Sequence, residues 1–233
     1  MRLNKLLTIL SIIAIASSCS TSKTLRFNQK EDDIVKTESL RDFLAVNKNP
    51  KVVLRVSDAT YTVTEDEKVD YLYNAIENQL LASGFIVRDR QLFNQIIGND
   101  DNTLDYAVLK DKSDTDLIIE LTKLDPQVIY KTNKYYNKNN EERVEPSVTH
   151  KRFGASIEFK VVLISSNEFA GIYKFNYTPC VDGCVISKTL TQTTKERKAR
   201  EKEGTKPYEG VEKDEFEIFI KDATVKLVSK MRD

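Results

Sequence analysis

The stretch GFIVRDRQLFNQII, residues 84–97, carries the pattern that decides the fold. Gly84 can adopt the left-handed conformation that ends a helix, and Phe85-Ile86-Val87 is an apolar run of strand length. From Arg90 onward the apolar residues follow helical spacing, at Leu92, Phe93, Ile96 and Ile97. The stretch therefore predicts a short strand that leads directly into a short helix.

The segments on either side continue this alternation of strand and helix. Upstream, residues 51–58 are rich in β-branched side chains and predict a strand, and Thr64 to Glu67 fits a capping box before a helix. That helix places its apolar residues on one face, at Val69, Leu72, Tyr73, Ile76, Leu80 and Leu81. Downstream, residues 116–124 form an apolar run typical of a strand covered on both faces. The order predicts an α/β fold.

The second half of the chain favours antiparallel strands. Apolar and charged residues alternate over 157–163, and a turn at 167–171 leads into a strand over 172–178. Helical spacing returns over 216–231, and it also occurs over 37–46 before the first strand. We therefore expect a mixed sheet of about five strands with flanking helices, in the order β-α-β-α-β-β-β-α.

Residues 1–19 have the pattern of a bacterial export signal. Arg2 and Lys5 precede an apolar stretch over 6–16, and Ala16-Ser17-Ser18-Cys19 resembles a lipobox. This resemblance implies cleavage before Cys19, a diacylglycerol thioether on its sulfur and an acyl chain on the new amino terminus. A retained membrane anchor is the alternative, but residues 6–16 as a helix extend only about 16 Å against a hydrocarbon core of about 30 Å.

These observations divide the chain into three parts. Residues 1–18 are expected to be the signal peptide, residues 19–36 a polar, lipidated tether, and residues 37–233 a single α/β domain. Two polar insertions, over 127–151 and 191–214, interrupt the second half of that domain. Ser20 stands where an inner-membrane retention signal usually has Asp, so we expect a lipid anchor in the outer membrane, facing the periplasm, with display on the cell surface as the alternative.

The cysteine count fits an exported lipoprotein. With Cys19 assigned to lipid, Cys180 and Cys184 remain as a pair, and an oxidising compartment favours a disulfide between them. Gly183 can hold a positive φ, which would set the two cysteines opposite each other across a short loop. A redox role is the alternative, but the spacing is C-x-x-x-C and no helix start follows to lower a thiol pKa.

The remaining chemistry of the chain points to binding rather than catalysis. Tyr130, Tyr135 and Tyr136 lie in the first insertion and are candidates for stacking on a sugar ring or on a partner surface, unless they only cover their own strands. His150 is the single histidine, so we expect no metal site built on paired histidines and regard His150 as solvated. The acidic loop with Asp100, Asp101 and Asp105 lacks the glycine and the terminal glutamate of a calcium loop.

No cofactor beyond the lipid is expected, and no catalytic set of nucleophile, base or metal is visible. The 36 basic and 36 acidic residues balance, so the net charge gives no argument for a nucleic-acid partner.

The order of elements over about residues 50–231 resembles the CsgG-like and TolB amino-terminal-like families of envelope proteins. The resemblance rests on residues 84–97, the helix before them, the strand beginning Asp116-Leu117-Ile118-Ile119 and the later hairpin. It implies a non-enzymatic, lipid-anchored binding or assembly protein with a protein partner in the envelope.

The alternative that the resemblance also implies is a ring-forming secretion or pore component of the CsgG type. That role requires membrane hairpins in the two insertions, yet residues 130–138 have no sustained apolar face. Residues 195–203 are almost entirely charged, which is costly for strands that face lipid. The sequence therefore favours the binding or assembly protein, and it leaves the oligomeric state open.

Overall fold

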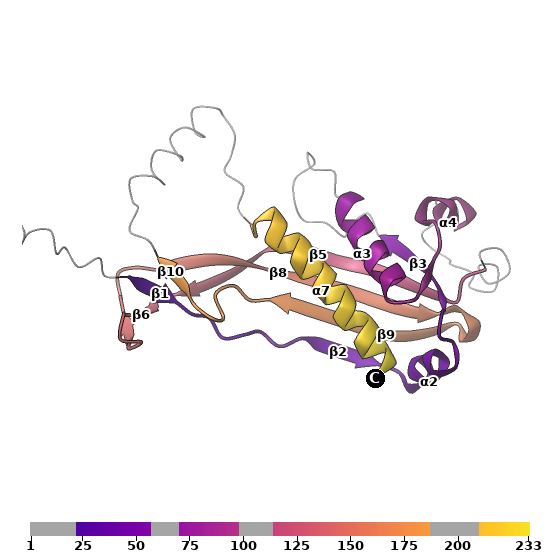
Figure 1. Ribbon diagram of the computed structural model, residues 1–233, viewed down its shortest axis with the longest axis horizontal. Coiled ribbons are helices and arrows are strands. Elements are labelled where there is room, and N and C mark those ends of the chain that lie inside the picture. The colour runs from indigo at the N-terminus through magenta and orange to yellow at the C-terminus, as the bar shows by residue number, and fades with distance from the viewer. Residues whose placement is uncertain (1–21, 57–69, 98–113, 187–209) are drawn as a thin grey trace, which may run out of the picture. The chain divides into compact units, whose positions relative to one another are not determined.

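The computed structural model describes residues 22–56, 70–97, 114–186 and 210–233 (Figure 1). These residues form two compact units. The small unit contains residues 22–27, 131–150 and 180–186, and the large unit contains the other described residues. The boundary between the units falls inside two strands, after Tyr130 and after His150.

The large unit is built on a six-stranded sheet of order β2-β9-β8-β5-β3-β4. In that order the strands are β2 (Asp33–Lys36), β9 (Glu168–Tyr177), β8 (His150–Leu163), β5 (Leu117–Thr132), β3 (Lys51–Val56) and β4 (Ile86–Val87). β3 pairs in parallel with both β4 and β5, whereas β9 pairs antiparallel with β2 and β8. The predicted α/β class with a mixed sheet is confirmed, although the sheet has more strands than expected.

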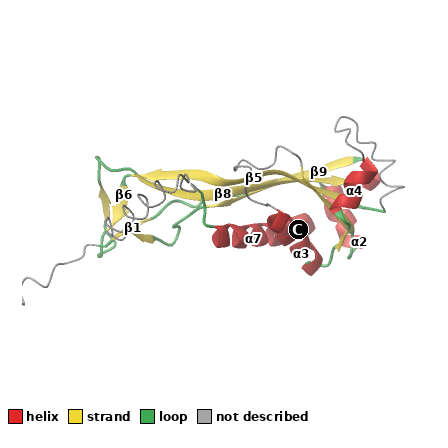
Figure 2. Cartoon of the chain, turned by 90° about the horizontal axis from the view of Figure 1, so that it is seen from above, coloured by secondary structure: helices red, strands yellow, loops and turns green. Residues whose placement is uncertain are grey.

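Three helices lie on one face of this sheet (Figure 2), namely α2 (Glu38–Val46), α3 (Asp70–Ala82) and α7 (Lys213–Arg232). Their apolar stripes pack against the inward side chains of the strands and form the main core. Buried helix residues of this core are Leu40 and Leu44, Leu72, Ile76 and Leu80, and Phe216, Ile220, Leu227 and Met231. Each of these helices was predicted from the spacing of those residues.

A smaller cluster covers part of the opposite face. Because side chains alternate along a strand, Val53 points away from its neighbours in the main core. There it joins Ile118, Val162, Ile164 and Phe93, which belongs to α4 (Arg90–Ile97). Helix α4 has the predicted bounds, but Leu92 is 57% exposed and therefore does not share the buried side of Phe93.

The predicted transition after α3 is present. Gly84 has φ +88°, its N–H donates to the Leu81 carbonyl oxygen, and the N–H of Phe85 donates to the Leu80 carbonyl oxygen. This pattern of bonds closes the last turn of the helix. Phe85 is then buried next to β4, and Asp89 accepts a bond from the Leu92 N–H at the start of α4.

The small unit contains an antiparallel sheet of order β10-β1-β6-β7. Its strands are β1 (Lys23–Leu25), β6 (Lys134–Tyr136), β7 (Glu142–Val144) and β10 (Cys184–Ile186). Two segments without a predicted strand of their own, the tether and the first insertion, therefore contain strands. β1 and β2 lie within the predicted tether, and the predicted insertion over 127–151 contains the end of β5, the β6–β7 hairpin and the start of β8.

Several predicted features lie outside the described residues. These are the signal peptide with Cys19, the capping box at Thr64 to Glu67, the acidic loop at 100–105 and almost all of the second insertion. Within the described ranges, no helix is both long enough and apolar enough to cross a membrane.

Candidate binding surface on the small sheet

The β6–β7 hairpin of the small sheet is held by its own turn residues. The side-chain oxygen of Asn137 accepts bonds from the N–H groups of Asn139 and Glu141, at 2.9 and 3.0 Å. Asn140 has φ +61°, a conformation that asparagine tolerates better than most residues. The turn therefore fixes the register in which Tyr135 lies opposite Arg143.

Tyr135 is stacked against a cation from the neighbouring strand. The ammonium nitrogen of Lys23 in β1 lies 4.6 Å from the centroid of the Tyr135 ring. The same nitrogen lies 2.6 Å from Oε2 of Glu145, which follows β7. Lys23 is thus held by a carboxylate while it supports the aromatic ring, a combination that fixes both side chains.

Tyr136 repeats this arrangement with different partners. The guanidinium carbon of Arg26 lies 4.7 Å from the centroid of the Tyr136 ring, and Thr24 of β1 pairs directly with Tyr136. The Tyr136 hydroxyl donates to Oε2 of Glu142 over 3.2 Å. Tyr135 and Tyr136 therefore each have one cation against the ring.

Ion pairs surround the two rings. The Lys23 ammonium donates to Glu145 and holds the pKa of that carboxyl below its usual value. The ammonium of Lys134, 2.8 Å from Glu142, likewise lowers the pKa of the Glu142 carboxyl. Glu142 is exposed and Glu145 is partly buried, and both carboxylates stay ionised at neutral pH, so each tyrosine has an ion pair beside it.

A pocket of about 310 Å³ opens beside Tyr135. It is lined by Lys23, the aromatic ring and the turn of the hairpin, including Asn137, Lys138 and Asn139. An aromatic ring next to amide and ammonium groups offers an apolar contact together with hydrogen-bond donors. This combination suits a ligand that has both a flat apolar surface and polar groups.

The predicted disulfide joins Cys180 to Cys184, whose Cα atoms are 5.0 Å apart. Gly183 has the expected positive φ, at +103°, and its N–H donates to the Cys180 carbonyl oxygen. A Cβ added to Gly183 would lie 2.8 Å from the Cγ2 atom of Thr24, so the loop lies close against β1. Because Cys184 is the first residue of β10 and pairs with Leu25, the disulfide fixes the end of β10 beside β1.

Tyr130, the third predicted tyrosine, belongs to the large unit and does not share this sheet. Its hydroxyl lies 3.2 Å from the Thr178 hydroxyl, and its ring lies close to Gly154. A Cβ on Gly154 would lie 2.5 Å from the ring. Tyr130 therefore packs within its own unit, and only Tyr135 and Tyr136 of the three predicted residues belong to the small sheet.

Lys23 and Arg26 were not among the predicted site residues, because their segment was interpreted as a tether. No signal was available, because Leu25 is the only apolar residue of β1 and three residues with one apolar position show no alternation. His150 also differs from the prediction. Its side chain is 15% exposed rather than solvated, and its Nε2 lies 3.7 Å from Oε2 of Glu145.

Comparison with known proteins gives no family for this chain. No family model and no curated protein matches it. Three of the solved structures with some likeness are a PelC dodecamer from Paraburkholderia phytofirmans, the hypothetical protein CT253 from Chlamydia trachomatis and a PDZ domain protein from Parabacteroides distasonis.

The likeness to each of these structures is weak. The PelC chain is 10% identical, with a TM-score of 0.40 and coverage of 87% of this chain and 96% of that one. CT253 is 9% identical, with a TM-score of 0.39 and coverage of 78% and 98%. The PDZ domain protein is 11% identical, with a TM-score of 0.29 and coverage of 86% and 41%. None of them carries an argument about this chain, and the resemblance to CsgG-like and TolB amino-terminal-like proteins stays a prediction.

Proposed function

We propose that this chain is a lipid-anchored, non-enzymatic binding or assembly protein of the bacterial envelope that faces the periplasm from the outer membrane. The observation that carries the binding role is the small sheet, where Tyr135 and Tyr136 are each supported by a cation. The proposed partner is another envelope protein, which contacts one of these rings.

The physical basis is preorganisation. A side chain that is already fixed loses little conformational freedom when a partner binds, so more of the contact energy appears as affinity. Tyrosine is suited to this role because its ring gives a large apolar contact and its hydroxyl remains a polar group. The cations at 4.6 and 4.7 Å and the Asn137 turn hold the rings before any partner arrives.

The location is supported by two independent features. Disulfides persist in oxidising compartments such as the periplasm, and Cys180 and Cys184 are joined. The sequence before Cys19 has the charged start, apolar stretch and small-residue end of an export signal. Both features fit a chain that leaves the cytoplasm and is held at a membrane through lipid.

The anchor is tested by replacing Cys19 with alanine and separating membranes from the soluble fraction. We expect the natural chain in the membrane fraction and the Cys19→Ala chain in the soluble fraction, with a mass change of the natural chain that matches lipid on its first residue. Membrane association that survives the Cys19→Ala substitution would rule out the lipid anchor.

The binding role is tested by the native mass of the complex after mild detergent extraction. We expect a complex with a second protein that is lost in the Tyr135→Ala, Tyr136→Ala double variant. The matched control is Tyr135→Phe, Tyr136→Phe, which keeps both rings and should keep most of the complex. A large homogeneous ring of this chain alone would instead support the secretion or pore role.

A further inference from the structure

A second, polar pocket of about 430 Å³ lies in the large unit, lined by α3 and by the segment that joins β4 to α4. Helix α3 contributes Asn74, Glu77, Asn78 and Leu81. These four positions follow the spacing i, i+3, i+4 and i+7, so they form one stripe along the helix. At 1.5 Å per residue the stripe is about 10 Å long, the length of about three residues of extended chain.

The other side of the pocket includes Val87, which belongs to the edge strand of the six-stranded sheet. The N–H of Ile86 donates to the Pro50 carbonyl oxygen, and the N–H of Arg88 donates to the Val52 carbonyl oxygen. In a parallel pair only alternate residues bond to the neighbouring strand, so the N–H and C=O of Val87 face away from β3. No strand in the described part of the chain pairs with that outer edge of β4.

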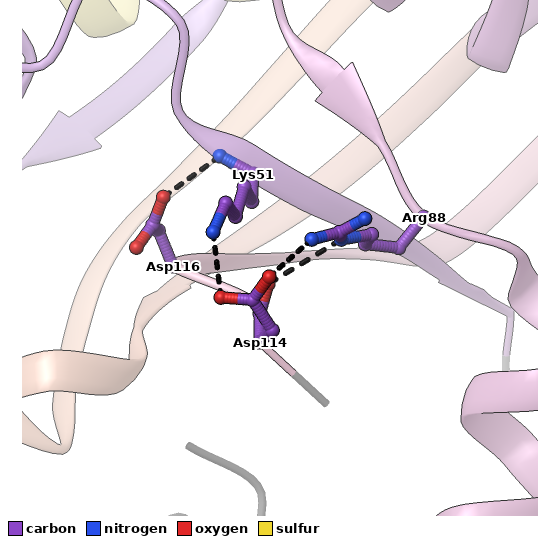
Figure 3. A network of polar contacts seen from close by, with 4 residues as sticks. All are labelled: Lys51, Arg88, Asp114 and Asp116. Atoms are coloured by element: carbon purple, nitrogen blue, oxygen red, sulfur yellow. Dashed lines mark hydrogen bonds and ion pairs between the residues drawn. The ribbon is translucent and has the colours of Figure 1, made fainter. Parts of the chain in front are cut away.

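The charged groups of the pocket already compensate one another. Arg90 is fixed over the Tyr73 ring at 4.8 Å, and its Nε lies 3.8 Å from Oε1 of Glu77. Arg88 is bound to the carboxylate of Asp114, which Lys51 also contacts at 2.6 Å (Figure 3). Both arginines therefore already contact a carboxylate, although Arg88 shares Asp114 with Lys51, and the lining carboxylates Glu77 and Asp89 disfavour a phosphate or other anion.

The uncharged groups match the backbone of a polypeptide. Each amide of Asn74, Asn78 and Gln91 carries a donor and an acceptor, as a peptide bond does. Asn74 and Asn78 are four residues apart, a rise of about 6.0 Å along the helix, which is close to the repeat of about 6.6 Å between alternate residues of an extended chain. No aromatic ring lines the pocket, so a sugar would find no stacking platform there.

We propose that this pocket binds an extended polypeptide segment of a partner protein. The segment adds to the free edge of β4 through the main chain of Val87, and its other edge pairs with the amides of Asn74 and Asn78. Leu81, which is 52% exposed, and the Val87 side chain accept an apolar side chain of the segment. All residues of this site belong to the large unit, so the proposal is tested independently of Tyr135 and Tyr136 in the small sheet.

The test is a titration of the full-length, ¹⁵N-labelled chain in detergent micelles with the blocked peptide acetyl-Ser-Val-Ser-Val-Ser-amide, followed by NMR. We expect the side-chain amide signals of Asn74 and Asn78 and the backbone signal of Val87 to move in a saturable way. The same peptide with its backbone N-methylated keeps every side chain but lacks N–H donors. It should not bind, because recognition is through the backbone.

Single substitutions inside and outside the pocket test where the peptide binds. Asn78→Leu should lower the affinity for the peptide about tenfold or more, since it removes a hydrogen-bond donor and an acceptor together. The matched control is Gln95→Leu, an exposed position of α4 that does not line the pocket, and it should leave the affinity unchanged. Tyr135→Ala should also leave it unchanged, which separates this site from the small sheet.

Three results would overturn the proposal. The first is the absence of any saturable shift with the peptide, and the second is equal binding of the N-methylated peptide. The third is a shift of the Asn74 and Asn78 signals by maltotriose or by inorganic phosphate but not by the peptide, which would assign the pocket to a sugar or an anion.

Discussion

Breaking the Cys180–Cys184 bond should loosen the small sheet and leave the large unit intact. The two cysteines are only four positions apart, so the closed loop is short. Chain-entropy arguments give such a loop about 2 kcal/mol of stabilisation. We expect the bond to raise the free energy needed to separate β10 from β1, because Cys184 is the residue of β10 that pairs with Leu25.

Hydrogen exchange gives the most direct readout of this change. In the Cys180→Ser, Cys184→Ser variant, amides protected by the pairing of β1 with β10 should exchange about 30-fold faster, which corresponds to about 2 kcal/mol of local opening. Amides of Val53 and Leu54 in β3, inside the large sheet, should keep their natural rates. Reduction of the natural chain with a thiol should reproduce the result.

Two outcomes would refute the reasoning. Unchanged exchange in β1 and β10 would show that strand pairing, and not the disulfide, holds this edge of the small sheet. Equal acceleration in β3 would show that the disulfide stabilises the whole chain, so that the two units do not open independently. A Val181→Ala variant, which changes the loop but keeps the bond, is the control for local changes in the loop itself.

Two further substitutions test the packing of the large unit and the electrostatics of the small one. Gly154→Ala should lower the free energy of unfolding by about 1 to 3 kcal/mol in urea denaturation, because the new Cβ would lie 2.3 Å from the Tyr177 carbonyl oxygen. Lys23→Met should raise the pKa of the Glu145 carboxyl toward its ordinary value in an NMR titration. Since the folded pKa is lowered, the stabilisation by this pair is present above the ordinary carboxyl pKa and is lost as the pH falls through the lowered one.

Each of these substitutions has a matched control. A Cβ on Gly84 meets nothing nearer than 3.7 Å, so Gly84→Ala strains the backbone at its φ of +88° without a steric clash and should leave the NMR signals of Tyr177 in place. Movement of those signals by both variants would contradict the steric explanation. Lys134→Met should raise the pKa of Glu142 and leave Glu145 unchanged. A Glu145 pKa that does not respond to loss of Lys23 would show that their contact is absent in solution.

Much of the large unit was predictable because each of these elements has a local sequence pattern that indicates it. The apolar stripe of α3, the glycine after it and the β-branched run of β3 each indicate one structure, and the protein contains all three. The exposed position of Leu92 in α4 shows the limit of this reasoning. Helical spacing identifies an apolar face, but only the neighbouring elements decide how much of that face is buried.

The strands of the small sheet could not be predicted in the same way. β6 and β7 are held by pairs such as Lys134 with Glu142 and by the Asn137 turn, so no apolar alternation marks them. β1 is three residues long and is defined by its partners, which lie more than a hundred positions away. Tyr135 and Tyr136 were predicted as surface residues, but the cations that support them were missed because their strand was missed.

The order of the two tyrosines along β6 restricts the shape of the proposed partner. Consecutive residues of a strand point to opposite faces of the sheet, so Tyr135 and Tyr136 look in opposite directions. A flat partner can reach one ring and not the other, and it would lose affinity in only one of the two single alanine variants. A partner that depends on both rings must contact both faces of the hairpin. It would lose affinity in each of the two single alanine variants, which distinguishes it from a flat partner.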